Sequence, residues 1–277
     1  MLLSRNYPPS DALAPYIRRH YVFQAELPPD FLLIDKLVSE TSFIRVLIRG
    51  EWQAETMPDN WGSAGPVPLF GSNGKPLRVR VRGPFTVTGV AIRPSGWRAL
   101  FGCSACDYAD RMVPLSDAWG KRDADDFHQA VLDGADDAAI VAGTEAVLLR
   151  RIAVSEYAPD AQMRRFEDIA RHDSTIRVHD AAEELGLSVR QMERQCRAAF
   201  GHTPKSVLRR SRFLDMATAM RGFSDFTAED LAALRYFDQS HLNREFRRFF
   251  GITPGAFQTA QTPLFTAGLK LRADGLT

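Results

Sequence analysis

The spacing of apolar residues differs between the two ends of the chain. Between Leu77 and Ile92, apolar and polar residues alternate on both sides of Gly83-Pro84, which predicts the two strands of a hairpin. The pattern also predicts strands at residues 16–26, 31–38, 43–48 and 67–70, followed by helices at 97–101, 123–132, 136–154 and 161–172. Short strands separated by Gly and Pro favour a barrel or sandwich in this part of the chain. We expect the apolar helix at 136–154 to pack on the barrel or to be shared with a second copy of the chain.

The C-terminal third contains an internal repeat with a constant offset of 50 residues. Residues 188–204 align with 238–254, so that Arg194 corresponds to Arg244 and Phe200-Gly201 corresponds to Phe250-Gly251. Two copies are too few for a solenoid, which needs about three or more stacked units. The repeat therefore indicates a duplicated helical unit.

Each copy has the start and stop signals of a helix. Ser188 and Asp238 are residue types that cap helix N-termini, and Gly201 and Gly251 suit the left-handed residue that follows a helix. Apolar residues recur at intervals of three and four on one face of each helix. Shorter helices are predicted just before the two copies, at residues 178–186 and 230–237. Helix, tight turn and second helix form the helix-turn-helix arrangement, whose second helix enters the DNA major groove.

A longer helix is predicted between the two copies, because residues 205–221 contain no proline or glycine. At ~1.5 Å per residue this helix would span roughly 25 Å. We expect it to hold two reading helices about one DNA turn, ~34 Å, apart on one face of the duplex.

The polar faces of the two capped helices carry side chains suited to DNA. Arginine can bond a guanine edge through two hydrogen bonds, and glutamine and asparagine can do the same with adenine. Arginines further along each helix can hold phosphates, which orient the protein without reading sequence; we assign Arg197, Arg247 and Arg248 to this role. Any one of these arginines could equally lie on a solvated helix face. The recurrence of Arg194 and Arg244 at matching positions favours DNA reading.

Residues 175–258 resemble the DNA-binding domain of the AraC/XylS family of bacterial transcription regulators, which consists of two helix-turn-helix units joined by a long helix. The similarity lies in the turn ending at Gly186, in 188–194, 200–204, 212–213 and Ala217, and in 238–246, 250–254 and Phe257 of the second unit. This resemblance implies the following base-reading residues: Arg190, Gln191, Glu193 and Arg194 in the first unit, and Gln239, Ser240, His241, Asn243 and Arg244 in the second. The chain departs from the family pattern at Arg235, where a glycine is usual, and at Cys196, where a phenylalanine is common.

The N-terminal part resembles the cupin-like sensor domains that are fused to such regulators, through residues 14–17, 69–71, 92–96 and 114–115. We therefore expect an α+β fold: an N-terminal cupin-like barrel or sandwich with flanking helices, and an all-α double helix-turn-helix domain. The expected divisions are a sensor domain at 1–122, a helical linker or dimerisation region at 123–173, the DNA-binding domain at 174–260 and a C-terminal tail at 261–277.

Composition and charge agree with this expectation. The chain has 277 residues, of which 45% are hydrophobic and 25% charged, as in ordinary globular proteins. The net charge is −2 over residues 1–159 and +3 from residue 160 onward, a mild asymmetry in the direction that nucleic-acid binding requires. No signal-like N-terminus and no apolar run of the ~18 residues needed for a membrane span are present, so we expect a cytoplasmic protein.

Residues that could support catalysis are few. Only His20 and His128 precede residue 160, so we expect no metal site. No Ser/His/Asp, glycine-rich phosphate-binding or paired-carboxylate arrangement stands out in the sequence, so we expect no cofactor and no enzymatic activity. Cys103 and Cys106 have the spacing of a redox pair, but a lone pair is weak evidence in a reducing cytosol. Five residues are candidates for a ligand pocket, although structural roles are also reasonable for them: Trp52, Trp61, Phe70, Arg93 and Trp97.

The sequence thus predicts a regulator that binds double-stranded DNA and contacts RNA polymerase if it is an activator. Its N-terminal domain is expected to sense a small molecule, to form a homodimer, or both. The alternatives are a thiol-based redox protein that uses Cys103 and Cys106, and a helical module that binds other proteins.

Overall fold

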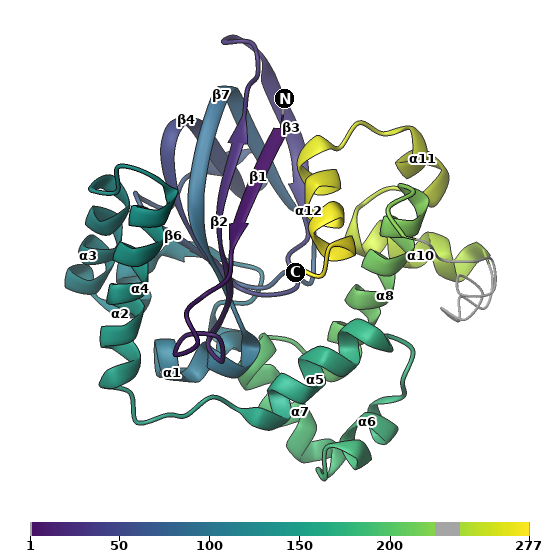
Figure 1. The fold of residues 1–277 in the computed structure, drawn as a ribbon. Helices are drawn as coiled ribbons and strands as arrows, with labels where there is room; N and C mark the ends of the chain where they lie inside the picture. Colours follow the sequence, from purple (N-terminus) through teal and green to yellow (C-terminus); the bar gives the residue numbers. More distant parts are fainter. Residues whose placement is uncertain (1, 225–238, 277) are drawn as a thin grey trace.

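The computed structural model describes residues 2–224 and 239–276. The N-terminal half is a strongly bent sheet with helices α1 to α4 beside it, and the remaining helices lie along another side of the sheet (Figure 1). The strands are β1 (Leu2–Tyr7), β2 (Ile17–Ala25), β3 (Leu32–Leu37), β4 (Phe43–Met57), β5 (Asn60–Gly62), β6 (Pro68–Phe70), β7 (Leu77–Ile92) and β8 (Met112–Pro114). The helices are α1 (Trp97–Phe101), α2 (Leu115–Trp119), α3 (Lys121–Leu132), α4 (Asp137–Ala153), α5 (Ala161–His172), α6 (Val178–Glu184), α7 (Val189–Phe200), α8 (Pro204–Met220), α10 (Gln239–Phe249), α11 (Pro254–Thr259) and α12 (Pro263–Ala273), with 3-10 turns η1 (Pro94–Gly96) and η2 (Ala105–Asp107).

All strand pairs in the sheet are antiparallel, in the order β1-β2-β7-β4-β6-β8, with β3 paired to β7 and β5 to β4. The prediction of a hairpin at Gly83-Pro84 is wrong, because β7 continues through these residues as one strand. Gly83 has a φ of 60° and Gly50, in the neighbouring strand β4, has a φ of 88°. The register of β4 against β7 shifts on either side of Arg49. The glycines therefore bend the two strands together instead of ending either of them.

The two faces of the sheet contribute to different hydrophobic cores, as alternating side chains require. Ile44, Val46 and Val90 pack with Trp97 and helices α2 to α4 on one face. Phe43, Trp52 and Phe85 belong to a second core on the other face, where Leu264 of α12 joins them. One sheet thus supports helices from both halves of the chain.

Helix α4 packs against the N-terminal domain through one face only. Ile140, Thr144, Val147 and Leu148 are buried. The opposite face is exposed and consists mainly of small apolar residues: Ala138, Ala139, Ala142, Ala146, Leu149 and Ala153.

The helical C-terminal part has two separate cores. Met192, Cys196 and Phe200 of α7 pack with α5, α6 and the first part of α8. Phe246 and Phe249 of α10 pack with the second part of α8, α11 and α12. Helix α8 has 17 residues and contributes to both cores, so it is the predicted connector between the two units. The predicted helix at 230–237, Arg235 and the cap residue Asp238 lie outside the described residues.

Residues 261–277, which we expected to form a tail, contain helix α12 docked on the sheet (Figure 1). The Asp35 carboxylate of β3 accepts hydrogen bonds from the backbone N–H groups of Leu264 and Phe265, at 2.7 and 3.2 Å. A side chain from another element therefore supplies the N-terminal cap of α12.

The other end of α12 is held by a buried ion cluster. Arg272 is 7% exposed. Its guanidinium lies 2.6 Å from the Glu40 carboxylate of the N-terminal domain and 2.5 Å from Asp215 of α8. Burial raises the pKa of Glu40, but the charges of Arg272 and Arg210 outweigh this effect and bring the pKa to about 2. Glu40 is therefore ionised at neutral pH and ties the two halves of the chain together.

We expect Arg272→Met to lower the free energy of unfolding by about 3–5 kcal/mol, because it leaves two carboxylates buried without their shared counter-charge. Lys270→Met removes an exposed charge from the same helix and should change the free energy of unfolding by about 0.5 kcal/mol or less. Urea unfolding followed by tryptophan fluorescence measures both values. Similar small effects of the two substitutions would contradict the assigned role of Arg272.

Candidate DNA-binding helices and their contacts with the N-terminal domain

The first predicted reading helix, α7, presents a continuous polar face to solvent. Arg190, Glu193, Arg194 and Arg197 are exposed, while the residues facing α5 and α8 are buried. The preceding turn contains Gly186 at a φ of 67°, which only a residue without a Cβ adopts readily. The side chains predicted to read bases in this helix are thus available to a ligand.

Gln191 differs from these neighbours because its side chain takes part in the helix cap. Its Oε1 accepts hydrogen bonds from the backbone N–H and the hydroxyl of Ser188, at 2.9 and 2.7 Å. The Ser188 hydroxyl in turn accepts from the Gln191 backbone N–H, which completes a capping box. The Gln191 Nε2 hydrogens are not used in the capping box. Oε1 is used, so a hydrogen bond from a base to Oε1 would compete with the helix cap.

The second predicted reading helix, α10, has a similar outward face. Gln239, Ser240 and Arg244 are exposed, and His241 and Asn243 are half-buried. The Gln239 amide donates to Asn243 Oδ1 at 3.4 Å. On the inner face the buried Glu245 carboxylate accepts hydrogen bonds from Arg209 of α8. This pairing fixes the rotation of α10 about its axis, with Arg244 directed to solvent.

The three arginines assigned to phosphates are also exposed: Arg197 on α7, and Arg247 and Arg248 on α10. Arg197 and Arg247 keep equivalent places in the two units, at the last turn of each helix.

The N-terminal domain holds the C-terminal end of each reading helix, at equivalent positions of the repeat. The Ser72 hydroxyl donates to the Phe200 carbonyl at the end of α7, at 2.5 Å. The Lys36 ammonium donates to the Phe250 carbonyl at the end of α10, at 2.6 Å. The last carbonyls of a helix lack partners within the helix and attract donors and cations. Sequence reasoning missed Lys36 and Ser72, because nothing local to either residue marks a contact so distant in the chain.

The middle of α8 is attached to the same part of the N-terminal domain. Arg210 is 2% exposed and donates to the carbonyls of Asn73 and Glu40, at 2.7 and 2.6 Å. A buried guanidinium requires such partners, since removing it from water is costly.

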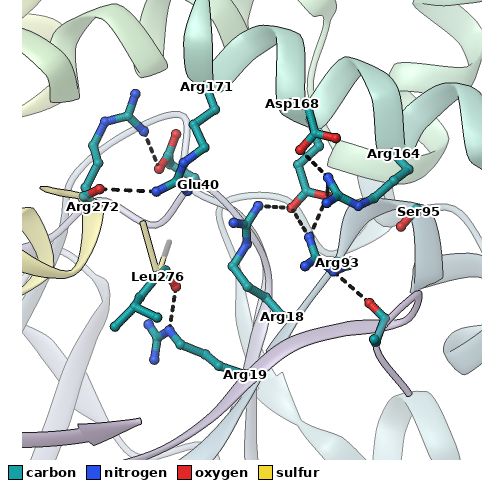
Figure 2. Close-up of polar contacts among 12 residues, drawn as sticks. Arg18, Arg19, Glu40, Arg93, Ser95, Arg164, Asp168, Arg171, Arg272 and Leu276 are labelled. Carbon is teal, nitrogen blue, oxygen red and sulfur yellow. Dashed lines mark hydrogen bonds and ion pairs between the residues drawn. The ribbon is translucent and has the colours of Figure 1, made fainter. Parts of the chain in front are cut away.

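A second group of ion pairs joins α5 to the N-terminal domain (Figure 2). The buried Glu167 carboxylate of α5 accepts hydrogen bonds from Arg18 of β2 and from Arg93. Arg164 pairs with Asp168 and Glu167 on the same helix. Arg19 donates to the Leu276 carbonyl at 2.7 Å, beyond the end of α12. These contacts account for Arg93, a predicted pocket residue that the structure places in an ion pair.

A cavity of about 160 Å3 lies between the sheet and helices α8 and α12. The sheet contributes aromatic walls that include Tyr21, Phe43, Trp52 and Phe85, and the helices contribute Leu214, Leu264 and Phe265. Of the predicted pocket residues, Trp52 lines the cavity, and Phe70 lies behind it against Phe43 and Trp52. Trp97 stacks on Phe101 in the other core, and Trp61 lies beside Arg78 and Arg80.

Among the residues that the structure describes, three arginines and one glutamate line the cavity: Arg19, Arg45, Arg272 and Glu40. Among the described residues, no carboxylate lies within ion-pair distance of Arg19 or Arg45. The Arg45 guanidinium lies 4.9 to 5.7 Å from the ring centres of Phe43, Trp52, Phe70 and Tyr21. Its Nε donates to the Tyr21 hydroxyl at 3.3 Å. Burial lowers the pKa of Arg19 to about 10, so Arg19 remains charged at neutral pH.

The cysteines differ in burial, and none is paired in a disulfide. All three are free thiols, with Cys103 half-buried, Cys106 exposed and Cys196 buried. Burial raises the pKa of Cys103, which disfavours the thiolate that thiol chemistry requires. Within residues 2–224 and 239–276, no group of three or more potential metal-ligating side chains is found, and none of the helices there has the length and apolarity needed to cross a membrane.

Comparisons with known proteins agree with the arrangement of the C-terminal helices. Residues 181–260 match the model of a helix-turn-helix domain, and residues 5–114 match a domain of unknown function (DUF6597). No curated protein matches the chain.

Among solved structures, the chain is similar to ToxT from Vibrio cholerae O395, at 11% identity and a TM-score of 0.45, covering 86% of this chain and 96% of that chain. ToxT from Vibrio cholerae strain SCE256 with an unsaturated fatty acid bound has 13% identity and a TM-score of 0.44, with coverage of 88% and 96%. The AraC-like transcriptional activator CuxR has 13% identity and a TM-score of 0.28, with coverage of 78% and 95%. The C-terminal part of the chain therefore contains a helix-turn-helix domain, at residues 181–260, of the kind found in DNA-binding transcription regulators.

Proposed function

We propose that the protein reads two successive major-groove segments of one duplex, with α7 in the first and α10 in the second. The observation that carries this proposal is that Arg194 and Arg244, at equivalent positions of the repeat, are both exposed on helices whose opposite faces are buried. Helix α8 has 17 residues and is roughly 25 Å long, a length that suits reading helices about one DNA turn apart.

The base-reading roles proposed for the individual side chains follow from their chemistry. Arg190, Arg194 and Arg244 suit guanine, Gln239 and Asn243 suit adenine, and Glu193 can accept from cytosine. Ser240 can donate or accept, and His241 is half-buried at the edge of the same face. We assign phosphate contacts to Arg197, Arg247 and Arg248, because phosphates attract charge without regard to sequence.

We expect Arg244→Ala to weaken binding to the preferred duplex by about 1–3 kcal/mol and to relax base preference there, since a bidentate contact with a base edge is lost. Arg247→Ala, one turn further along the same helix, should weaken binding to all duplexes alike. Fluorescence anisotropy on a selected duplex and a scrambled one, at several salt concentrations, measures both effects. Equal losses on the two duplexes for Arg244→Ala would contradict base reading. A complex without salt dependence would favour a protein-docking module instead.

The cavity between the sheet and α12 is the proposed site of a small-molecule effector. A ligand there would contact both the N-terminal domain and the helices attached to the DNA-binding units, and a ligand shifts a conformational equilibrium when it contacts two states differently. The lining favours an apolar molecule with a negatively charged group, because Arg19 and Arg45 lack carboxylate partners among the described residues. The four rings around Arg45 leave its terminal nitrogens without a hydrogen bond to the described residues.

For this effector site we expect octanoate or 3-phenylpropanoate to raise the melting temperature, whereas the primary amide of each acid should have little effect. Arg45→Met should abolish the response, because it removes the charge that would receive the carboxylate. Arg49→Met removes an exposed arginine from the same strand, outside the cavity, and should keep the response. Equal shifts with acids and amides, or no shift with any of them, would count against an anionic effector.

A second copy of the chain is the other proposed partner of the N-terminal domain. The exposed alanine-rich face of α4 supports this proposal, since small side chains let two helices approach closely.

We expect Ala146→Glu, in the middle of that face, to weaken self-association by on the order of tenfold, because it places a charge inside a helix pair. Ala158→Glu alters an exposed residue beyond α4 and serves as the control. Sedimentation equilibrium measures the dissociation constants. A wild-type protein that stays monomeric at high concentration would argue against this partner.

A further inference from the structure

Among residues 2–224 and 239–276, the two DNA-reading units have separate hydrophobic cores. The described residues packed around α7 and those packed around α10 form separate clusters, and α8 contributes to both. The centre of α8 carries polar residues: Arg209, Arg210, Ser211 and Arg212. Packing within the C-terminal part therefore holds the helices of each unit together separately. Among the described elements of this part, α8 connects the two units and sets the distance between them.

Two segments of the N-terminal domain bridge the units. We call residues 36–42 and 71–74 the bridging segments. The first holds the end of α10 through Lys36, whose ammonium donates to the Phe250 carbonyl and lies 5.0 Å from the centre of the Phe250 ring. The second holds the end of α7 through Ser72, whose hydroxyl donates to the Phe200 carbonyl. Phe200 and Phe250 occupy the same position in the two repeats.

The bridging segments are tied to each other. The Ser39 N–H donates to Asn73 Oδ1 at 3.1 Å, and the Asn73 N–H donates to the Ser39 carbonyl at 2.9 Å. Both segments also bind Arg210 at the middle of α8, through the carbonyls of Glu40 and Asn73. Ser72 and Asn73 are buried, so water competes little for these hydrogen bonds. Hydrogen bonds and two short stretches of backbone, 36–39 and 72–73, thus connect the end of α10 to the end of α7 through residues outside the DNA-binding domain.

The glycines after the two reading helices leave room for these contacts. Both have a positive φ, 77° for Gly201 and 80° for Gly251. A Cβ on Gly201 would lie 3.0 Å from the Ala105 carbonyl oxygen and 3.3 Å from Ser72 Oγ, and a Cβ on Gly251 would lie 3.1 Å from Lys36 Nζ. The N-terminal domain therefore lies close to both helix ends, through backbone and side-chain atoms at Gly201 and through the Lys36 side chain at Gly251.

We propose that Lys36 and Ser72 are positioning residues that set the distance between the two DNA segments the protein accepts. The inference rests on the proposed function, in which α7 and α10 read the same duplex. Neither residue reads a base. By holding equivalent carbonyls on two independently packed units, the residues restrict how far α7 and α10 can move relative to each other, and so restrict the length of DNA between their targets.

The test uses the full-length protein and the duplex that it selects from a random pool. Base pairs are added or removed between the two recognised DNA segments. Each added base pair shifts the second segment by about 3.4 Å along the duplex and rotates it by roughly 35° about the duplex axis. We expect the wild-type protein to lose affinity on the order of tenfold when the spacing changes by one base pair. The Lys36→Met/Ser72→Ala variant should lose less than about threefold, because its units can adjust to the new spacing.

Lys75→Met is the matched control, because it removes an exposed charge next to the second bridging segment and should keep the wild-type spacing profile. Each single variant should relax the profile in part, so that the test survives if the double variant does not fold. An unchanged spacing profile in the single and double variants would overturn the inference and would indicate that α8 sets the accepted spacing. A change of affinity by the same factor at every spacing would also overturn it. A wild-type protein that binds all duplexes alike would overturn the proposed function itself, and this inference with it.

Discussion

The burial of two guanidinium groups between the halves of the chain is the constraint on which the arrangement depends. An arginine keeps its charge under all ordinary conditions, so it leaves water only where polar partners replace the solvent. Arg210 finds those partners in the carbonyls of the N-terminal domain, and Arg272 finds them in Glu40 and Asp215. Separating the two halves of the chain would expose these guanidinium groups to water or leave them without their hydrogen-bond and ion-pair partners. The sheet and the helical units therefore form one body, although each has its own hydrophobic core.

The same contacts place the cavity where it can influence the DNA-binding units. Leu37, Ser39, Glu40 and Thr41 line the cavity and also belong to the segment that bears Lys36. On the opposite wall, Leu214 and Arg272 come from α8 and α12. In the proposed function, a ligand that moves either wall changes the contacts that hold α7 and α10, without a separate relay through the domain.

Elements with strong local signals could be predicted from the sequence. The predicted helices at 97–101 and 161–172 agree with α1 and α5 residue by residue, and the caps at Ser188, Gly201 and Gly251 fall where the repeat places them. The prediction of a hairpin at Gly83-Pro84 was wrong, because a glycine can bend a strand as well as end it. Pairing with the matching bend in β4 makes β7 a single bent strand. The exposed faces of α7 and α10 also followed from periodicity. Periodicity places Gln191 on the outward face but does not predict that its side chain accepts hydrogen bonds in the helix cap.

Contacts between distant parts of the chain were beyond sequence reasoning. Asp35 caps a helix that begins more than two hundred residues later, and Arg45 lies among rings from several strands. Their local patterns are those of an ordinary strand.

The separate packing of the two reading units has an evolutionary consequence. In the proposed function, mutations that alter which bases are recognised and mutations that alter the spacing of an operator can arise in different domains of the protein. A descendant could then adapt to a rearranged promoter through changes near Ser39 and Asn73, while every side chain that faces the nucleotides stays the same.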